Sequence, residues 1–562
     1  MIKSLSIGNF KAFGVTQEVP IRPITLIFGP NSAGKSSIIH SLALAHEASR
    51  RGELDVFKTE LGGSSIDLGG FRQYVFRRNS VNDIEFGWTL EASKLPRRLK
   101  ELLGSTRTTT INATFGFPMD IDELFEKDSQ GNLITNPFPT RPELISYELL
   151  GDDETIIRMS RRKGSVMAID RLELGHPVIK HLISALLESY TFTLSPTEAD
   201  FETISTVLNE LVAALRSHGY IFLPRNIEIY DADESDEDSN GDDLERLLES
   251  EKQASLSTAT DRRSQIERAV RLYMPRLLGE LVGQLSKAID GELGRLQYLG
   301  PLRSYPPRHV AFADTDDPNW RAGGGFAWDV LRRDKDVREA VNSWLNDKER
   351  LSTPYELIVE DLLPRSDLAE DYNQVIEDIE QEYADGEVDD LFGAIYDALD
   401  TSISGNSAVQ EINLVDRRTN TKVSHRDVGI GISQVLPVLV AAYASRNSLI
   451  AIEQPEIHIH PALQAELGDV FIQSALGTTN NTLLLETHSE HLILRLLRRI
   501  RETAEGSLPD GHPGMMPDQI AVLYVQPSKD GSKVTEIPIT EDGEFARKWP
   551  DGFFAERVKE LM

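Results

Sequence analysis

The sequence predicts an α/β fold whose central sheet is assembled from distant parts of the chain. Three short, largely apolar stretches have the composition of buried strands, at residues 24–28, 448–453 and 482–485. Each of them runs into a turn that carries glycine, acidic or histidine side chains. More than 400 residues separate the first stretch from the second, so a long insertion must divide the sheet.

Composition limits the classes of protein to consider. The chain has 562 residues, which suggests three or four structural units at about 150 residues each. Its formal charge of −31 is concentrated in two windows, 231–251 and 360–400, so the remainder is nearly neutral. The chain lacks cysteine, which excludes disulfides and thiolate chemistry. The longest apolar run spans about ten residues, 435–444, against about twenty for a membrane span, so we expect a cytoplasmic protein without membrane association.

Four regions are expected along the chain. Residues 1–95 form strands, including one at 4–10, and residues 96–292 form a mostly helical insertion with helices at 178–190, 201–217 and 265–296. Pro275 is expected to interrupt the last helix. Within the insertion, the acidic loop 231–251 is expected to be disordered. Residues 293–516 return to strands, with an acidic helical segment at 360–400 and a hairpin at 411–415 and 422–425, and residues 517–562 form a small α+β domain.

The turn after the first buried strand matches the phosphate-binding pattern G-x-x-x-x-G-K-[ST]. Its glycines let successive backbone N–H groups and the next helix N-terminus face a phosphate. Lys35 can reach the β- and γ-phosphates, and the Ser36 hydroxyl can bind Mg²⁺. The motif therefore predicts ATP or GTP binding by the following residues: Gly29, Pro30, Asn31, Ser32, Ala33, Gly34, Lys35, Ser36 and Ser37.

A carboxylate partner for Mg²⁺ should end another buried strand. Glu453 does so, and a glycine- and serine-rich turn at 427–433 precedes its strand. The third buried strand ends before His488. The order of the motifs is therefore phosphate loop, Gly/Ser helix start, acidic strand end and histidine strand end.

This order resembles that of the prokaryotic AAA/ABC-type ATPases related to SMC heads and OLD-family proteins. More narrowly, the chain resembles a group that ends in a small domain of the WPxGFF kind. The matching stretches are NFKAF (9–13), GPNSAGKS (29–36), YLGPLRSYP (298–306), DVGIGISQVLP (427–437), IEQPEIHIHP (452–461), ETHSEH (486–491) and WPDGFF (549–554). The resemblance implies an ABC-type P-loop ATPase head with ATP and Mg²⁺ as cofactors.

The resemblance also implies roles for residues outside the phosphate loop. The signature residues Gly429, Gly431, Ser433 and Gln434 would complete the ATP site of a second copy, giving a homodimer or a higher even oligomer. His488 would sense the γ-phosphate, and Gln73 would join the Mg²⁺ site. The residues expected near the nucleoside are Asn9, Phe10 and Lys11.

One departure from the family pattern concerns the general base. Most such heads have Asp-Glu-Pro where this chain has Glu453, Gln454 and Pro455, followed by Glu456. A glutamine orients water but cannot accept its proton. Either Glu456 supplies the base or hydrolysis is slow and ATP acts as a latch, and we expect slow turnover.

Other patterns support weaker alternatives. Four histidines (His458, His460, His488 and His491) lack zinc-site spacing, and Asp236 to Gly241 copies only half of an EF-hand loop. Arginine clusters near 161–163, 262–271 and 495–501 could contact nucleic acid, although helical arginines more often pair with acids. The insertion lacks the sustained heptads of a long SMC arm, and no nuclease-like strand pattern follows His488.

The resemblance to defence ATPases implies a regulatory or sensor subunit of an antiphage system that controls a separate effector, such as a nuclease. Two alternatives remain open. One is a DNA-engaging, SMC-like repair or chromosome ATPase head, and the other is a nearly inert scaffold latched by ATP.

Overall fold

The computed structural model describes residues 2–118, 125–127, 133–135, 141–162, 166–189, 198–217, 222–229, 262–303, 317, 319–347, 350, 353–362, 409–423 and 430–549. Several sequence predictions fall outside these ranges. They include the acidic loop at 231–251, residues 363–400 of the acidic helical segment, the signature glycine Gly429 and most of the WPDGFF stretch.

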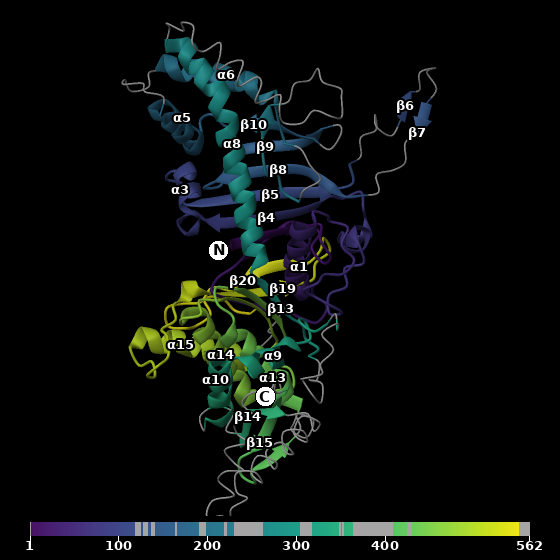
Figure 1. The fold of residues 1–562 in the computed structure, drawn as a ribbon, viewed down its shortest axis with the longest axis vertical. Helices are drawn as coiled ribbons and strands as arrows, with labels where there is room; N and C mark the ends of the chain where they lie inside the picture. The colour runs from purple at the N-terminus through teal and green to yellow at the C-terminus, as the bar shows by residue number, and fades with distance from the viewer. Residues whose placement is uncertain are drawn as a thin grey trace, which may run out of the picture.

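A six-stranded sheet contains the three buried strands that the sequence predicts (Figure 1). Its strands are β13 (Leu296–Leu299), β17 (Leu449–Glu453), β18 (Thr482–Glu486), β3 (Ile24–Phe28), β19 (Ile520–Gln526) and β20 (Lys533–Glu536), in that spatial order. The first five run parallel, and β20 closes one edge antiparallel. Strands β3, β17 and β18 are buried along their whole length, which explains their continuous apolar sequence.

Helices cover both faces of this sheet. Helix α1 (Lys35–Arg51) contacts β13 and β18, and helix α14 (Pro461–Leu476) contacts β3 and β18. Alternate side chains of β3 accordingly enter two cores, because Leu26 packs in one apolar cluster and Ile27 in the other. The second core also receives α9, α10, α13 and α15 (Phe326–Arg333, Lys335–Asn346, Ile430–Ala444 and Glu490–Glu505). A three-stranded sheet of β14, β15 and β16 (Tyr355–Leu362, Val409–Asp416 and Thr421–Val423) lies against α9 and α10.

A second, nine-stranded antiparallel sheet forms the other part of the molecule (Figure 1). Its order is β12-β11-β10-β9-β8-β5-β4-β1-β2. The bounds are β1 (Ile2–Gly8), β2 (Gln17–Pro20), β4 (Ile84–Glu91), β5 (Thr108–Gly116), β8 (Glu143–Gly151), β9 (Glu154–Arg162), β10 (Val166–Leu172), β11 (Leu215–Ser217) and β12 (Glu228–Ile229). Helix α8 (Arg262–Gly294) runs across these strands and, with 33 residues, is about 50 Å long. Helices α3, α5 and α6 (Arg97–Leu103, Pro177–Ser189 and Glu198–Val212) pack against it.

The structure differs from the predicted insertion in three respects. Residues 96–292 contain long strands as well as helices, and β4 pairs with β5, so one sheet crosses the expected boundary at 95/96. The helix expected to reach residue 217 ends at Val212, and strand β11 follows. Helix α8 continues through Pro275, whose side chain is buried with Met274 and Leu278. Tertiary packing therefore outweighs the hydrogen bond that proline cannot make.

The described residues of the predicted C-terminal domain, 517–549, do not form a separate unit. Strand β19 pairs in parallel with β3, the strand that leads into the phosphate loop. The ring of Trp549 lies 5.3 Å from that of Phe28 at the end of β3. Residues 517–549 thus complete the six-stranded sheet, and the predicted boundary at 516/517 does not separate two cores.

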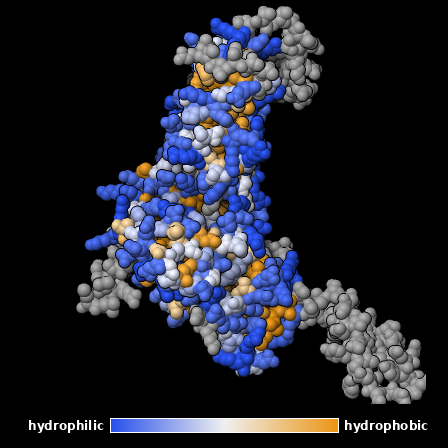
Figure 2. Space-filling view, turned by 90° about the vertical axis from the view of Figure 1, so that its left-hand side faces the viewer, coloured by the Kyte–Doolittle hydropathy of each residue, from blue (hydrophilic) through white to orange (hydrophobic). Residues whose placement is uncertain are grey.

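Two of the predicted elements, a hairpin and a helix, agree with the structure. The expected hairpin is present as β15 and β16, and the helix expected at 178–190 is α5. No helix within the described ranges is long and apolar enough to cross a membrane. Figure 2 shows a face that is hydrophilic over most of its area, with hydrophobic side chains gathered in small groups.

Candidate nucleotide-binding site

The loop between β3 and α1 has the backbone conformation of a phosphate cradle. Gly29, Ser32 and Gly34 have positive φ angles of 148°, 61° and 93°. A Cβ on Gly34 would lie 2.3 Å from the Cβ of Ala12, and one on Gly29 would lie 2.2 Å from the carbonyl oxygen of Val525. Only glycine fits at these two positions. Helix α1 begins directly after this loop, so its N-terminus lies where a bound phosphate is favoured.

The two side chains that the motif assigns to phosphate and metal are held by short contacts. Lys35 is buried, and its Nζ donates hydrogen bonds to the carbonyl oxygens of Gly29 (3.2 Å) and Pro30 (3.1 Å). Burial lowers the pKa of Lys35. The Ser36 hydroxyl donates a 2.6 Å hydrogen bond to Oε2 of Glu486, whose Oε1 lies 3.8 Å from Lys35 Nζ.

Glu453 ends β17, as the sequence predicts for a Mg²⁺ carboxylate, and its oxygen Oε1 meets two groups. Tyr298 donates a 3.0 Å hydrogen bond to it, and His40 Nε2 lies 3.4 Å away. The other ring nitrogen of His40 is 2.6 Å from Nζ of Lys11. Burial lowers the pKa of His40 and lowers the pKa of Lys11 to about 8. Lys11 is therefore linked through His40 to Glu453.

Glu456 connects the ends of two neighbouring strands. Its Oε2 accepts a 2.8 Å hydrogen bond from the Thr487 hydroxyl, and its Oε1 accepts a 2.7 Å bond from the backbone N–H of His488. Burial raises the pKa of Glu456. The backbone N–H of Gln454, which has a positive φ of 47°, donates to the carbonyl oxygen of Glu486 at 2.7 Å. The turn after β17 is thus fixed to the end of β18.

Glu486 is the acidic residue that the sequence analysis did not assign. It ends β18, which lies between β3 and β17, and it pairs in register with Glu453. Burial and the charge of Glu453 raise the pKa of Glu486 to about 7. The signal that identified Glu453, an acid at the end of a buried strand, is equally present here.

Arg303 is a second residue to which the sequence analysis gave no role. It joins helix α13 to the turn after β17. Its guanidinium donates to the carbonyl oxygens of Glu453 (3.0 Å), Gln454 (3.2 Å) and Gln434 (3.3 Å). The side-chain amide of Gln434 donates back to the Arg303 carbonyl oxygen at 3.0 Å. Burial lowers the pKa of Arg303 to about 10, so the group stays charged at neutral pH. Ser433 is buried beside Gln434 at the start of α13.

The remaining predicted residues differ in exposure. Asn31 and Ser32 are exposed in the loop, and Ala33 and Ser37 are buried. Phe10 is fully buried, with its ring 5.7 Å from Tyr74, so a nucleoside contact would require movement of its loop. Asn9 has a positive φ of 52°. Gln73 is exposed on the short helix α2 (Phe71–Tyr74). Gly431 and His488 are half-buried, and burial and the charge of Lys35 lower the pKa of His488.

The arginine clusters are mostly neutralised by nearby acids. Arg495 and Arg499 both bind Asp469, at 2.5 and 2.7 Å. Arg262 pairs with Asp200 at 2.8 Å on α6. Within the described part of the chain, no group of three or more His, Cys, Asp or Glu residues could hold a metal ion by itself.

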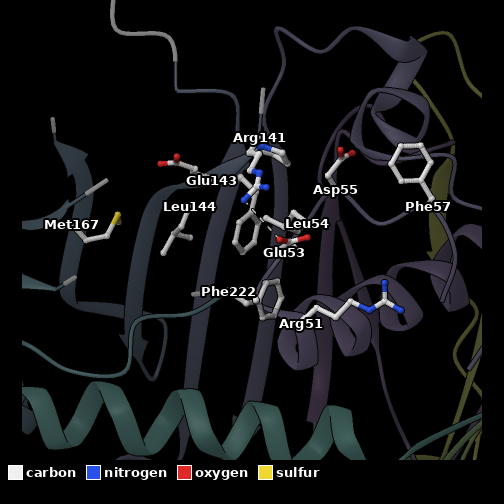
Figure 3. A pocket seen from close by; sticks show the side chains of 13 residues that line it. Arg51, Glu53, Leu54, Asp55, Phe57, Arg141, Glu143, Leu144, Met167 and Phe222 are labelled. Atoms are coloured by element: carbon white, nitrogen blue, oxygen red, sulfur yellow. Dashed lines mark ion pairs between the residues drawn. The ribbon is translucent and has the colours of Figure 1, made fainter. Parts of the chain in front are cut away.

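A separate cavity of about 820 Å³ lies at the other end of α1 (Figure 3). Phe115 and Phe222 line it, with ring centroids 5.1 Å apart, together with Arg51 and Arg141. Because α1 has 17 residues, its two ends are roughly 24 Å apart, so this cavity is distinct from the phosphate loop. Arg141 lies 3.9 Å from Glu53.

Comparisons with known proteins agree with this geometry. Residues 4–270 match a family model described as an AAA domain, and residues 326–493 match one described as an AAA ATPase domain. Residues 515–562 match a family described as a protein of unknown function (DUF3696). No curated protein sequence matches the chain.

Three solved structures of SMC heads are among those that match. One is a SmcHead bound to the C-winged helix domain of ScpA, with 10% identity, a TM-score of 0.32, and coverage of 96% of this chain and 98% of that one. Another, from Pyrococcus furiosus, is an Smc head domain with an extended coiled coil bound to the C-terminal domain of ScpA. It has 9% identity, a TM-score of 0.32, and coverage of 100% of this chain and 98% of that one. The third is the SMC head domain from Thermotoga maritima, with 8% identity, a TM-score of 0.31, and coverage of 96% of this chain and 99% of that one.

Residues 4–270 and 326–493 are therefore AAA-type ATPase domains, and the parallel sheet and the phosphate loop agree with this class. This confirms the predicted ATPase class, while the relation to OLD-family proteins stays a prediction. The residues present suit Mg-ATP, because Mg²⁺ is usually bound by one or two carboxylates together with substrate phosphates. Ser36, Glu453 and Glu486 supply a hydroxyl and carboxylates beside the loop.

Proposed function

We propose that this chain binds Mg-ATP at the phosphate loop and hydrolyses it slowly. The observation that carries the proposal is the position of Lys35 and Ser36 at the start of α1, with Glu486 2.6 Å from Ser36. Lys35 and the backbone N–H groups would hold the phosphates, and Ser36 and Glu453 would hold Mg²⁺. The ion would neutralise charge on the phosphate oxygens.

Slow turnover follows from the residues that could accept a proton from the attacking water. Gln454 occupies the position of the usual base and cannot accept that proton. Both carboxylate oxygens of Glu456 already accept hydrogen bonds, from Thr487 and from the backbone of His488. These bonds favour a bracing role for Glu456, and therefore favour ATP as a latch over rapid cycling.

We further propose that two chains close around ATP, as a homodimer or a larger even oligomer. Ser433 and Gln434 are buried within the chain, so the contact to the partner's nucleotide would come from Gly431 and the signature residues before it. The dimer would act as a regulatory or sensor subunit for a separate effector, such as a nuclease, in antiphage defence. This last step rests on the sequence resemblance to defence ATPases.

The test begins with ATP binding and turnover by the purified chain and by Lys35→Ala. Tight binding with little turnover, lost in the variant, is expected. The effector role predicts that the product of a neighbouring gene co-purifies with the chain. A protein that stays alone and protects no cell from phage would contradict that role. ATPase activity that DNA stimulates with steep salt dependence would instead favour the SMC-like alternative.

A further inference from the structure

The hydroxyl of Ser36 makes its hydrogen bond to the carboxylate on β18. A serine hydroxyl has one proton to donate and two lone pairs to offer. Because the proton is directed at Glu486 Oε2, 2.6 Å away, the lone pairs remain for a cation. The same carboxylate lies 3.8 Å from Lys35 Nζ, so it is adjacent to both side chains that the motif assigns to Mg-ATP.

Glu453, the residue expected to serve the metal, has different partners. Its Oε1 accepts a hydrogen bond from Tyr298 and faces His40, which lies on α1 one helical turn after Ser36. Tyr298 belongs to β13, two strands beyond β18. Of the two carboxylates that pair in register, the one on β18 is therefore the one bonded to the loop.

The charge around Glu486 also favours a cation. Three buried carboxylates, on Glu453, Glu456 and Glu486, belong to the ends of two neighbouring strands and the turn that joins them by hydrogen bonds. A divalent cation at this point would relieve the repulsion. Glu486 is as buried as a core residue, although its side chain is a carboxylate. Burying a carboxylate costs free energy unless it is paired, hydrogen-bonded or bound to a metal.

We propose that Glu486 is a positioning residue of the Mg²⁺ site: it holds the Ser36 hydroxyl with its lone pairs free for the ion, and it adds negative charge there. This inference rests on the proposed Mg-ATP binding. It assigns to the middle strand β18 a part in metal binding that the sequence motif gives to β17 alone.

The test compares ATP affinity with and without Mg²⁺ in the full chain. Isothermal titration with ATP is performed in excess Mg²⁺ and in EDTA for the wild type, Glu486→Gln, Glu453→Gln and the exposed control Glu505→Gln. Glutamine keeps an oxygen that can accept the Ser36 proton, so only the charge is lost. We expect Glu486→Gln to reduce the gain in affinity from Mg²⁺ about tenfold or more, the usual cost of removing a supporting group at a metal site. Binding in EDTA should be equal or tighter, because a negative charge beside the phosphates is removed.

The outcomes separate this inference from the proposed function. If Mg²⁺ raises the ATP affinity of Glu486→Gln as much as that of the wild type, the inference is overturned. Glu486 would then be only a hydrogen-bond acceptor for Ser36. The inference is also overturned if Glu453→Gln loses the increase in ATP affinity caused by Mg²⁺ and Glu486→Gln keeps it. Binding of ATP in EDTA shows that each variant is folded. If the wild type binds no ATP at all, the proposed function fails and not merely this part of it.

Discussion

The buried charge of Glu486 should make the stability of the chain depend on pH. In the folded protein, burial and Glu453 raise the pKa of Glu486 to about 7, from the ordinary value of 4.5. The folded state therefore keeps a proton that the unfolded chain releases at lower pH. The stability contributed by this proton is full below pH 4.5, declines as pH rises, and is lost above pH 7.

The change Glu486→Gln should remove this decrease of stability with rising pH, because glutamine does not ionise. One pKa unit corresponds to about 1.4 kcal/mol, so the shift amounts to on the order of 3 kcal/mol of unfolding free energy above pH 7. The variant should melt about 3 °C higher than the wild type at pH 8, with the difference approaching zero at pH 5. Differential scanning calorimetry in EDTA without nucleotide measures both values, and Glu505→Gln is the exposed control. Equal melting temperatures at pH 8, or a difference that does not change with pH, would refute the reasoning.

Three further changes test other parts of the site. Gly34→Ala should weaken ATP binding roughly tenfold or more, because the added Cβ would lie 2.3 Å from that of Ala12 at a φ of 93°; titration with ATP measures this. Arg303→Met should lower the melting temperature and turnover, since three backbone carbonyl oxygens lose a donor at about 1–3 kcal/mol for each one left buried and unpaired. Unchanged melting would contradict that cost. A chain that ends at residue 516 should be insoluble, because β3 loses its hydrogen-bonded neighbour β19. A soluble fragment that binds ATP would show that the C-terminal residues are dispensable.

The parts of the fold that could be predicted were those with strong local patterns. The buried strands at 24–28, 448–453 and 482–485 match β3, β17 and β18 within one residue at each end. Their apolar sequences have no other stable placement than a covered sheet. The phosphate loop was equally clear, because its glycines are required by backbone angles that other residues avoid.

The parts that could not be predicted depend on contacts between distant residues. Strands β5 and β8 carry alternating burial, yet the residues that pair between these two strands are dozens of positions apart, and local periodicity does not reveal that pairing. Strand β19 is buried at six successive positions, but its own sequence does not reveal that it pairs with β3, near the other end of the chain. The roles of Arg303 and Glu486 arise from side chains that meet only after the sheet is assembled.

The most direct test of the central claim is a titration of the purified chain with ATP and Mg²⁺, beside Lys35→Ala. The account predicts that the wild type binds ATP and hydrolyses it slowly, and that the variant, without its buried phosphate-loop ammonium, binds weakly or not at all. Equal binding by the two proteins, or no binding by the wild type, would contradict it.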